Sequence, residues 1–549
     1  MFKKGKVLVL GLAIATGVFF SSATSDNFFE ISKNLDIFTN VYKQLNIYYV
    51  EDTKPGELMK TSIDAMLRSL DPYTVYYPES DIEDYRFLTT GEYGGIGSLI
   101  RKKGDYIIIA EPYEGFPAFN AGLNAGDIIL KVDGKDAVRK TTSEISHLLK
   151  GQAKTSLTLS IDRNGELLEK VLTRENIKIK DVPYYGEISP GIGYIKLVGF
   201  TETASKELSA AYKILKENKK VDKLILDLRG NGGGLLNEAV NIVNFFVERG
   251  QEVVHTKGKL KEWDRSHKAL NAPLDLEIPM VVLIDGGSAS ASEIVSGALQ
   301  DVDRAVIVGE RSFGKGLVQQ TKPLSYNSQL KVTVAKYYIP SGRCIQELDY
   351  GNKKNGKAQV VDDSLLIPFY TKNKRPVLEG QGIKPDVKVD LPEGAHVTAS
   401  LIRNYHIFDY ATRYFYSNDS IKAAKEFRLS DSDYEEFIAY LEGKAYEYET
   451  DSEILLKRLK EVSKNEKYFN KLENSFTAME SELSNNKRND LDLHKEEIKT
   501  ILENEIVSRY YYQSGRAESG LANDTRLLKA VELLNNPSIC DSILTFVPK

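Results

Sequence analysis

The chain has 549 residues, of which 42% are hydrophobic, and its formal net charge is −5. This length leaves room for about three or four domains, and the composition argues against a largely disordered protein. A weakly acidic charge gives no general attraction to nucleic acid, so we expect no nucleic-acid partner. The two cysteines, Cys344 and Cys540, are too few for a disulfide framework. We expect two unpaired thiols, with one bridge between distant regions as the alternative.

Residues 1–25 have the features of a targeting segment. Lysines at positions 3, 4 and 6 precede an apolar run of 14 residues, and Ser21-Ser22-Ala23 then offers small residues for cleavage after Ala23. This apolar run is short for a hydrocarbon core of about 30 Å. We therefore expect a cleaved export signal and a periplasmic or cell-envelope protein, with an uncleaved membrane anchor as the alternative.

Residues 26–90 are predicted to form a helical N-terminal region. Apolar residues recur at helical spacing between positions 28 and 45, and again between positions 59 and 70. Pro72 ends the second run, because proline disfavours a helical conformation in the residue before it. We interpret this region as an amphipathic packing or dimerisation arm.

Residues 91–175 change to short β-rich runs separated by glycine turns. Residues 106–110 and 157–161 are typical of strands. Between them, residues 117–134 read PAFNAGLNAGDIILKVDG, in which a small-residue helix precedes a strand and an Asp-Gly turn. This segment closely follows the PAxxAGLxxGDxIxxVDG pattern of PDZ domains, so the region resembles a PDZ-like domain.

Upstream of this pattern lies a short glycine-rich run made of Gly94, Gly95, Ile96 and Gly97. A glycine turn between strands is the common structural explanation for such a run. Consecutive backbone amides can also form an anion-binding nest, beside which a peptide adds as a strand. With the PDZ pattern downstream, the resemblance implies that this run binds substrate by capturing the C-terminal carboxylate of a protein tail.

Residues 176–395 are predicted to be an α/β core, because strands and helices alternate along them. The expected elements are strands at 193–198 and 223–228, helices at about 203–217 and 236–247, and later strands at 305–308 and 329–339. The run at 223–228 is almost continuously apolar, as in a buried parallel strand.

A glycine-rich turn, DLRGNGGG at residues 227–234, connects the expected strand and helix. Such a turn exposes backbone amides at the positive end of a helix. It is consistent with a flexible connection or with an anion site for phosphate.

Residues 286–320 read GGSASASEIVSGALQDVDRAVIVGERSFGKGLVQQ. Serines before a helix, here expected at 293–300, commonly act as caps. The alternative is that one serine is a nucleophile beside amides that stabilise an oxyanion. Lys315, flanked by glycines, is a candidate base, since burial lowers the pKa of a lysine. None of the six histidines lies in this window, although folding can bring one to it.

This window closely resembles the C-terminal processing peptidases, or tail-specific proteases, whose SASASE and FGKGxVQ segments carry serine, lysine and glutamine. The resemblance implies that Ser290 is the nucleophile, Lys315 the general base and Gln319 the residue that orients the lysine. The choice of Ser290 over Ser288 and Ser292 comes from the resemblance, because all three serines could cap the helix.

The same resemblance assigns the oxyanion hole to backbone amides of Ala291 and of Gly232 or Gly233, and implies no metal or organic cofactor. It covers about residues 35–395 and ends with GIKPDVKV, at 382–389, as the closing strand of the core. It implies a crotonase-like or ClpP-like α/β peptidase core. We therefore predict an α/β (α+β multidomain) protein with a core at 176–395, an inserted PDZ-like domain at 91–175 and helical terminal regions.

A competing interpretation uses residues 309–316, GERSFGKG, which match the first seven positions of a phosphate-binding GxxxxGK loop. That motif needs a Ser or Thr after the lysine and a following helix. Gly316 follows the lysine, and an extended segment running into a proline comes next. Both requirements fail.

Residues 396–549 lie outside these motifs and are predicted to be a helical appendage with solvated charged faces. The function predicted is that of an exported serine endopeptidase, a hydrolase, that cleaves protein substrates near C-terminal tails held by the PDZ-like domain. The alternative is a non-catalytic exported PDZ adaptor in which Ser290 is only a cap. A homo-oligomer and an accessory adaptor protein stay open as partners.

Overall fold

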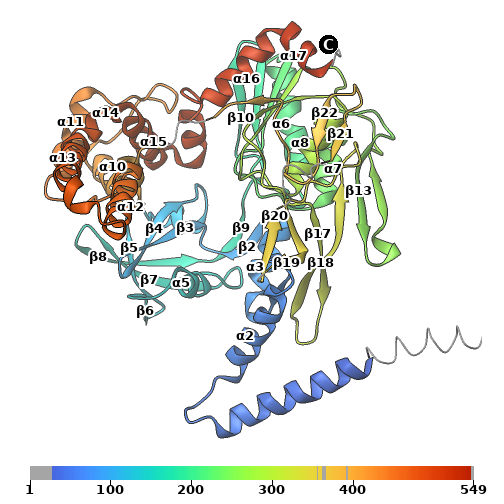
Figure 1. Ribbon diagram of the computed structural model, residues 1–549, viewed down its shortest axis with the longest axis horizontal. Coiled ribbons are helices and arrows are strands. Elements are labelled where there is room, and N and C mark those ends of the chain that lie inside the picture. The colour runs from blue at the N-terminus through green and yellow to red at the C-terminus, as the bar shows by residue number, and fades with distance from the viewer. Residues whose placement is uncertain (1–27, 355, 361–366, 391–393, 546–549) are drawn as a thin grey trace, which may run out of the picture. The chain divides into compact units, whose positions relative to one another are not determined.

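The computed structural model describes residues 28–354, 356–360, 367–390 and 394–545 (Figure 1). The chain divides into two compact units, residues 1–76 and 77–549. The expected targeting segment, 1–25, lies outside the described residues. In the part of the chain that the structure describes, no helix combines the length and apolar character that a bilayer span requires.

The described part of the first unit contains helices where they were predicted. Residues 28–48 form a helix, and α2 (Pro55–Arg68) follows it. Pro55 begins α2, where its missing N–H costs nothing and its fixed φ suits the first turn. The helix at 28–48 leaves large apolar side chains exposed, among them Leu35 and Phe38.

A six-stranded sheet is the centre of the second unit. Its neighbouring strands are, in order, β10 (Tyr184–Ser189), β11 (Ile192–Lys196), β12 (Lys223–Asp227), β15 (Met280–Ile284), β16 (Val306–Gly309) and β23 (Val387–Lys388). Strands β11 to β23 run parallel, and β10 is antiparallel to β11. The central strands are apolar almost throughout because both faces of the sheet are covered.

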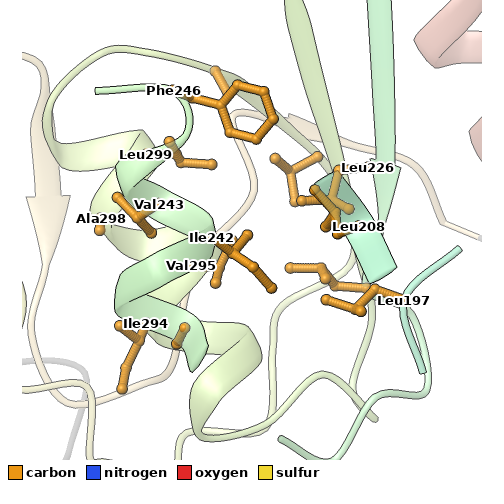
Figure 2. Packing of buried hydrophobic residues seen from close by; sticks show 14 of the residues in the cluster. Leu197, Leu208, Leu226, Ile242, Val243, Phe246, Ile294, Val295, Ala298 and Leu299 are labelled. Carbon is orange, nitrogen blue, oxygen red and sulfur yellow. The ribbon is translucent and has the colours of Figure 1, made fainter. Parts of the chain in front are cut away.

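Three helices cover one face of this sheet: α6 (Ala204–Asn218), α7 (Leu236–Asn244) and α8 (Ala291–Asp301). Figure 2 shows Ile242 of α7 and Val295 of α8 pointing into the same apolar cluster as Leu226 of β12. Every residue of α8 is buried. The strands and helices predicted for the α/β core are thereby confirmed.

The opposite face is covered by α16 (Thr525–Asn535) and α17 (Pro537–Leu544), which Figure 1 shows in red beside β10. Leu527 and Leu533 of α16 pack in one cluster with Ile225 of β12 and Val281 of β15. The appendage interpretation is therefore wrong for these two helices. They complete a three-layer core with strands that lie more than 200 residues earlier in the sequence.

Four of the other C-terminal helices form a separate helical cluster around its own apolar core: α9 (His396–Arg403), α10 (His406–Ser417), α11 (Asp431–Leu441) and α15 (Lys495–Ser519), with Leu491 of α14 (Asp490–Leu493) packed against it. The helices α12 (Asp451–Asn465) and α13 (Phe469–Arg488) contact each other. Helical content was predicted for this region from periodicity.

The PDZ-like region folds as an antiparallel sheet. Its strands are β3 (Ser98–Lys103), β4 (Tyr106–Pro112), β5 (Ile128–Val132), β7 (Ser156–Arg163) and β8 (Glu166–Thr173), with β6 (Lys135–Asp136) beside β5 and helices α4 (Pro117–Asn120) and α5 (Thr142–Leu149). Lys103 pairs with Asp409 of α10 at 2.6 Å, and Glu111 pairs with Arg516 of α15 at 2.8 Å. The helical cluster and the PDZ-like sheet are therefore in direct contact.

A second antiparallel sheet lies beside the site described below. Its strands β17 (Leu317–Pro323), β18 (Gln329–Tyr338), β13 (Glu252–Gly258) and β14 (Arg265–Lys268) pair in that order. Cys344 and Cys540 are buried and unpaired, as predicted.

Candidate active site

Two turns meet at the carboxyl ends of the neighbouring parallel strands β12 and β15. The first follows β12 and contains the DLRGNGGG glycines, and the second follows β15 and leads into α8. The carbonyl of Asn231 accepts the backbone N–H of Ala289 at 3.0 Å and the hydroxyl of Ser292 at 2.8 Å. These hydrogen bonds fix one turn against the other, at the edge where open α/β sheets place their ligands.

Ser290 occupies the N-cap of α8 with φ 57° and ψ −110°. An ordinary N-cap residue is extended, so capping alone does not require this conformation. A non-glycine residue at such angles is strained, and strain of this kind clusters at functional sites. Ser290 is half-buried, and it lines a pocket of about 740 Å³ together with Lys315, Gln319 and Tyr337.

The other two candidate serines are committed to the fold. Ser288 and Ser292 are both fully buried. The hydroxyl of Ser288 donates to the carbonyl of Leu228 at 2.9 Å, and that of Ser292 donates to the carbonyl of Asn231 at 2.8 Å. Among the three serines of this turn, only Ser290 lines the pocket.

Lys315 lies in the loop before β17, and two buried side chains tie its backbone to that of Ser290. Glu293 Oε2 accepts the N–H of Ser290 at 2.8 Å and the N–H of Lys315 at 2.9 Å. The Tyr337 hydroxyl lies 2.8 Å from the carbonyl oxygen of Lys315 and 3.1 Å from that of Ser290, and its hydrogen can be shared between them. The backbones of the proposed nucleophile and base are thus held by one carboxylate and one phenol.

Glu293 is fully buried and accepts four hydrogen bonds. Its Oε1 accepts the N–H of Gly314 at 2.7 Å and the hydroxyl of Ser312 at 2.6 Å, in addition to the two bonds to Oε2. Burial raises the pKa of Glu293, and the four hydrogen bonds that it accepts oppose that rise. The two oxygens of Glu293 face four donors. A protonated carboxyl would itself donate from one oxygen, so only the ionised carboxylate accepts all four hydrogen bonds.

Gly233 lies directly against the start of α8. Its φ is 97°, and a Cβ at this position would come within 2.6 Å of the Ala289 carbonyl oxygen and 2.9 Å of the Ala291 nitrogen. Only glycine fits there. The Gly233 N–H donates to Asn231 Oδ1 at 2.9 Å, whereas the Gly232 N–H has no hydrogen-bond partner within the described ranges. The structure brings all three predicted oxyanion-hole residues to the pocket.

Gln319, on β17, also lines the pocket. Its side-chain amide donates to Thr333 on the neighbouring strand β18 at 3.2 Å. A bulge in the pairing of β17 with β18 falls between Val318 and Gln319, and such irregularities redirect side chains at functional sites.

The pocket contains a histidine that the sequence window lacked. His267, on β14, lines the same cavity as Ser290 and Lys315. Burial, together with Arg265 and His255, lowers the pKa of His267, so the imidazole is neutral at neutral pH. No local signal in the sequence joins position 267 to position 290, because only the pairing of β14 with β13, and of β13 with β18, brings them together.

The run Gly94 to Gly97 is divided between two environments. Gly94 and Gly95 belong to β2 (Glu92–Gly95), which pairs with β9 (Glu175–Lys178), whereas Ile96 and Gly97 form the link from β2 to β3. All four residues are buried. The link directly precedes β3, and α5 contacts β3. Carboxylate capture by this run stays a prediction.

The phosphate-loop alternative finds no support in the backbone. A phosphate loop needs a helix after its lysine, and Lys315 is followed by strand β17. Throughout the described residues, no three His, Cys, Asp or Glu side chains gather to hold a metal ion.

Three family models match this chain. Peptidase family S41 matches residues 191–351, a PDZ domain matches 108–163, and a domain described as "Probable PDZ-protease, C-terminal helical domain" matches 397–534. The S41 match contains both turns, Ser290 and Lys315.

Two related proteins match this chain over much of their own length. A carboxy-terminal-processing protease of Bartonella bacilliformis is 39% identical over 353 residues, which cover 63% of this chain and 81% of the relative. A probable CtpA-like serine protease of Staphylococcus aureus is 35% identical over 364 residues, or 66% of each chain. Among solved structures, a photosystem II D1 C-terminal processing protease aligns with 28% identity over 64% of this chain and 92% of that chain, with a TM-score of 0.35.

Proposed function

The chain belongs to the carboxy-terminal-processing proteases of peptidase family S41, and we propose that Ser290 and Lys315 form its catalytic dyad. It is a serine-type peptidase, a hydrolase that carries a PDZ domain and acts on protein substrates at their C-termini. The finer proposal concerns which residues perform the reaction, how the tail is held and where the enzyme works.

One observation carries the dyad proposal: Glu293 and Tyr337 each hydrogen-bond to the backbones of both Ser290 and Lys315. These hydrogen bonds place the two backbones side by side in one pocket. The commitment of the Ser288 and Ser292 hydroxyls to backbone carbonyls supports the same choice of nucleophile.

In the proposed reaction, the neutral amine of Lys315 takes the proton of Ser290 Oγ as that oxygen attacks a peptide carbonyl. The amides of Ala291 and of the 232–233 turn donate to the tetrahedral oxyanion, and one such donor is worth about 3 kcal/mol. The lysine returns its proton to the leaving amine. A water molecule, deprotonated by the same lysine, then hydrolyses the acyl-enzyme.

We propose that Gln319 orients the lysine amine from β17 and that the PDZ domain holds the substrate tail. An extended peptide would add beside β3, with its carboxylate at the link formed by Ile96 and Gly97. Support comes from the position of this link before β3 and from the contact between α5 and β3. A tail held there delivers an upstream peptide bond to the pocket.

We also propose that the enzyme is exported to the periplasm or cell envelope. The basic residues, apolar run and small residues of segment 1–25 support this location. Mass spectrometry of the N-terminus of the protein recovered from its host tests it. A mature N-terminus after Ala23 agrees with export by a cleaved signal, and an intact N-terminus in the cytoplasmic fraction contradicts it.

The experiment that tests the function compares wild type and Ser290→Ala on an unstructured protein, with cleavage sites mapped by mass spectrometry. A serine-directed fluorophosphonate, with the adduct located on the chain, is a second readout. Wild type is expected to cleave and Ser290→Ala to be inactive. His267→Gln is the matched control for the base, and we expect it to retain cleavage. Cleavage by Ser290→Ala would contradict the proposal, and an inactive wild type would favour the non-catalytic PDZ adaptor.

A further inference from the structure

Helix α16 begins beside the turns that form the site. Its N-cap residue, Asp524, makes two kinds of interaction. Asp524 is the N-cap of α16, and its Oδ1 accepts the backbone N–H of Arg526 at 3.0 Å and of Leu527 at 3.1 Å. Its other oxygen, Oδ2, lies 2.6 Å from Nη2 of Arg229. One carboxylate therefore caps the helix and pairs with a residue of the DLRGNGGG turn.

Arg229 immediately precedes the glycines of that turn. Its Nε and Nη2 donate to Asp227 at 3.0 and 2.7 Å, and Lys196 donates to its backbone carbonyl at 2.8 Å. Burial raises the pKa of Asp227, but Lys196 and Arg229 outweigh that effect and bring it to about 2. The guanidinium of Arg229, largely buried, is thus held between Asp227 on the sheet and Asp524 on α16.

A second charged residue of α16 reaches the other turn. Arg526 pairs with Glu310, and its Nη1 lies 4.0 Å from Asp285 Oδ2. Asp285 Oδ1 accepts the N–H of Gly230 and of Gly287, each at 2.9 Å. Asp285 therefore ties both turns to each other, and the start of α16 closes over them.

We propose that Asp524 is a positioning residue for the oxyanion hole. It holds Arg229, and through Arg229 it holds the turn that places Gly232 and Gly233 beside Ser290. Apolar packing of α16 on the sheet gives this contact a rigid base, because Leu527 and Leu533 are buried there. This inference rests on the proposed function of Ser290 and adds a role for the C-terminal helices in the reaction.

The test is Asp524→Asn, measured with Asp524→Glu as the conservative variant. Asparagine caps a helix as well as aspartate does, so the substitution removes the charge facing Arg229 and keeps the cap. Asp433→Asn is the matched control: Asp433 also serves a helix start, that of α11, where it accepts from the N–H and hydroxyl of Ser430. All variants are assayed for kcat and KM on an unstructured peptide and for Tm.

We expect Asp524→Asn to lower kcat about tenfold, which is less than the loss from removing an oxyanion donor outright. KM should stay within about twofold, and Asp524→Glu should recover most of kcat. Tm should fall below that of Asp433→Asn, because a largely buried guanidinium loses one of its two carboxylates, so kcat is compared per folded enzyme, and Asp433→Asn should keep the wild-type value. In an Arg229→Lys background, Asp524→Asn should add little, because the paired group has already changed.

A wild-type kcat in Asp524→Asn would overturn the inference. So would a loss of activity that is fully explained by the fraction of the variant that is unfolded. Ser290→Ala separates this failure from failure of the proposed function. If Ser290→Ala is inactive and Asp524→Asn is unimpaired, only the positioning role is lost. If Ser290→Ala still cleaves, the proposed function itself fails.

Discussion

The backbone amides of Ser290 and Lys315 donate to the same oxygen, Oε2 of Glu293, at 2.8 and 2.9 Å. Position 290 begins α8, and position 315 lies in the loop before β17. Both residues are half-buried and line one pocket. Because a buried carboxylate of α8 binds both backbone amides, the packed core fixes the position of Ser290 relative to Lys315.

Glu293→Gln should disable the site. Oε1 of Glu293 accepts the N–H of Gly314, and Oε2 accepts the N–H of both Ser290 and Lys315, so an amide nitrogen in place of either oxygen sets a donor against backbone donors and removes their hydrogen bonds. We expect kcat to fall about 100-fold and stability by about 2–4 kcal/mol. Peptide cleavage and denaturant unfolding measure the two effects.

The control for this prediction is Asp301→Asn. Asp301 is also buried, lies at the other end of α8 and pairs with Arg343 at 2.9 Å. The Asp301→Asn variant should be less stable than wild type, but its folded molecules should have the wild-type kcat. Equal losses of kcat in Glu293→Gln and Asp301→Asn would show that Glu293 acts only through the stability of the helix.

Gly233→Ala should abolish cleavage, and Gly232→Ala should leave folding intact. An added Cβ at position 233 meets backbone atoms at 2.6 and 2.9 Å at an unfavourable φ of 97°, whereas one at position 232 meets nothing within 4 Å. We expect a Tm loss equivalent to at least about 2 kcal/mol for Gly233→Ala. Thermal unfolding checks both variants, and equal Tm values would contradict the packing around Gly233.

Ser288→Ala and Ser292→Ala should weaken the fold without removing the nucleophile. Each substitution deletes a buried hydroxyl that donates to a backbone carbonyl. The expected cost is about 1–2 kcal/mol for each. Both variants should still form a fluorophosphonate adduct at Ser290, located by peptide mapping. An adduct that disappears in Ser288→Ala or Ser292→Ala, at full folding, would assign the nucleophile to that serine.

The burial of His267 should make the free energy of unfolding depend on pH. Burial lowers the pKa of its imidazole below the ordinary value of 6.5, so on acidification the unfolded state takes up a proton before the folded state does. The folded state is therefore penalised as the pH falls below about 6.5. His267→Gln should lose less Tm than wild type between pH 7 and pH 5. Parallel Tm curves for the two proteins would contradict a buried neutral imidazole.

Strands β11, β12 and β16 of the main sheet and helix α8 could be predicted because their signals are local. Buried parallel strands read as continuous apolar runs, such as the one that became β12. The glycines of DLRGNGGG follow β12 and the serines of SASAS follow β15, and the two turns meet at one sheet edge because these strands are parallel neighbours. Strand β15 was not among the predicted strands.

What the sequence could not show depends on contacts between distant positions. Tyr337 reaches Ser290 and Lys315 only through the pairing of β17 with β18, and Asp524 reaches Arg229 only once α16 covers the sheet. Glu293 alone had a usable signal. A glutamate at the third position of a helix, three residues after a serine, suggests a carboxylate that turns back to the helix start.

The measurement that tests the account most directly is the rate of peptide cleavage by Lys315→Arg. Arginine is a basic side chain of similar length, but its guanidinium stays protonated at any pH used for the assay and so cannot accept the proton of Ser290. A general base contributes at least about 100-fold. We predict that Lys315→Arg folds like wild type and loses at least that factor in kcat. Wild-type turnover in this variant would contradict a dyad of Ser290 and Lys315.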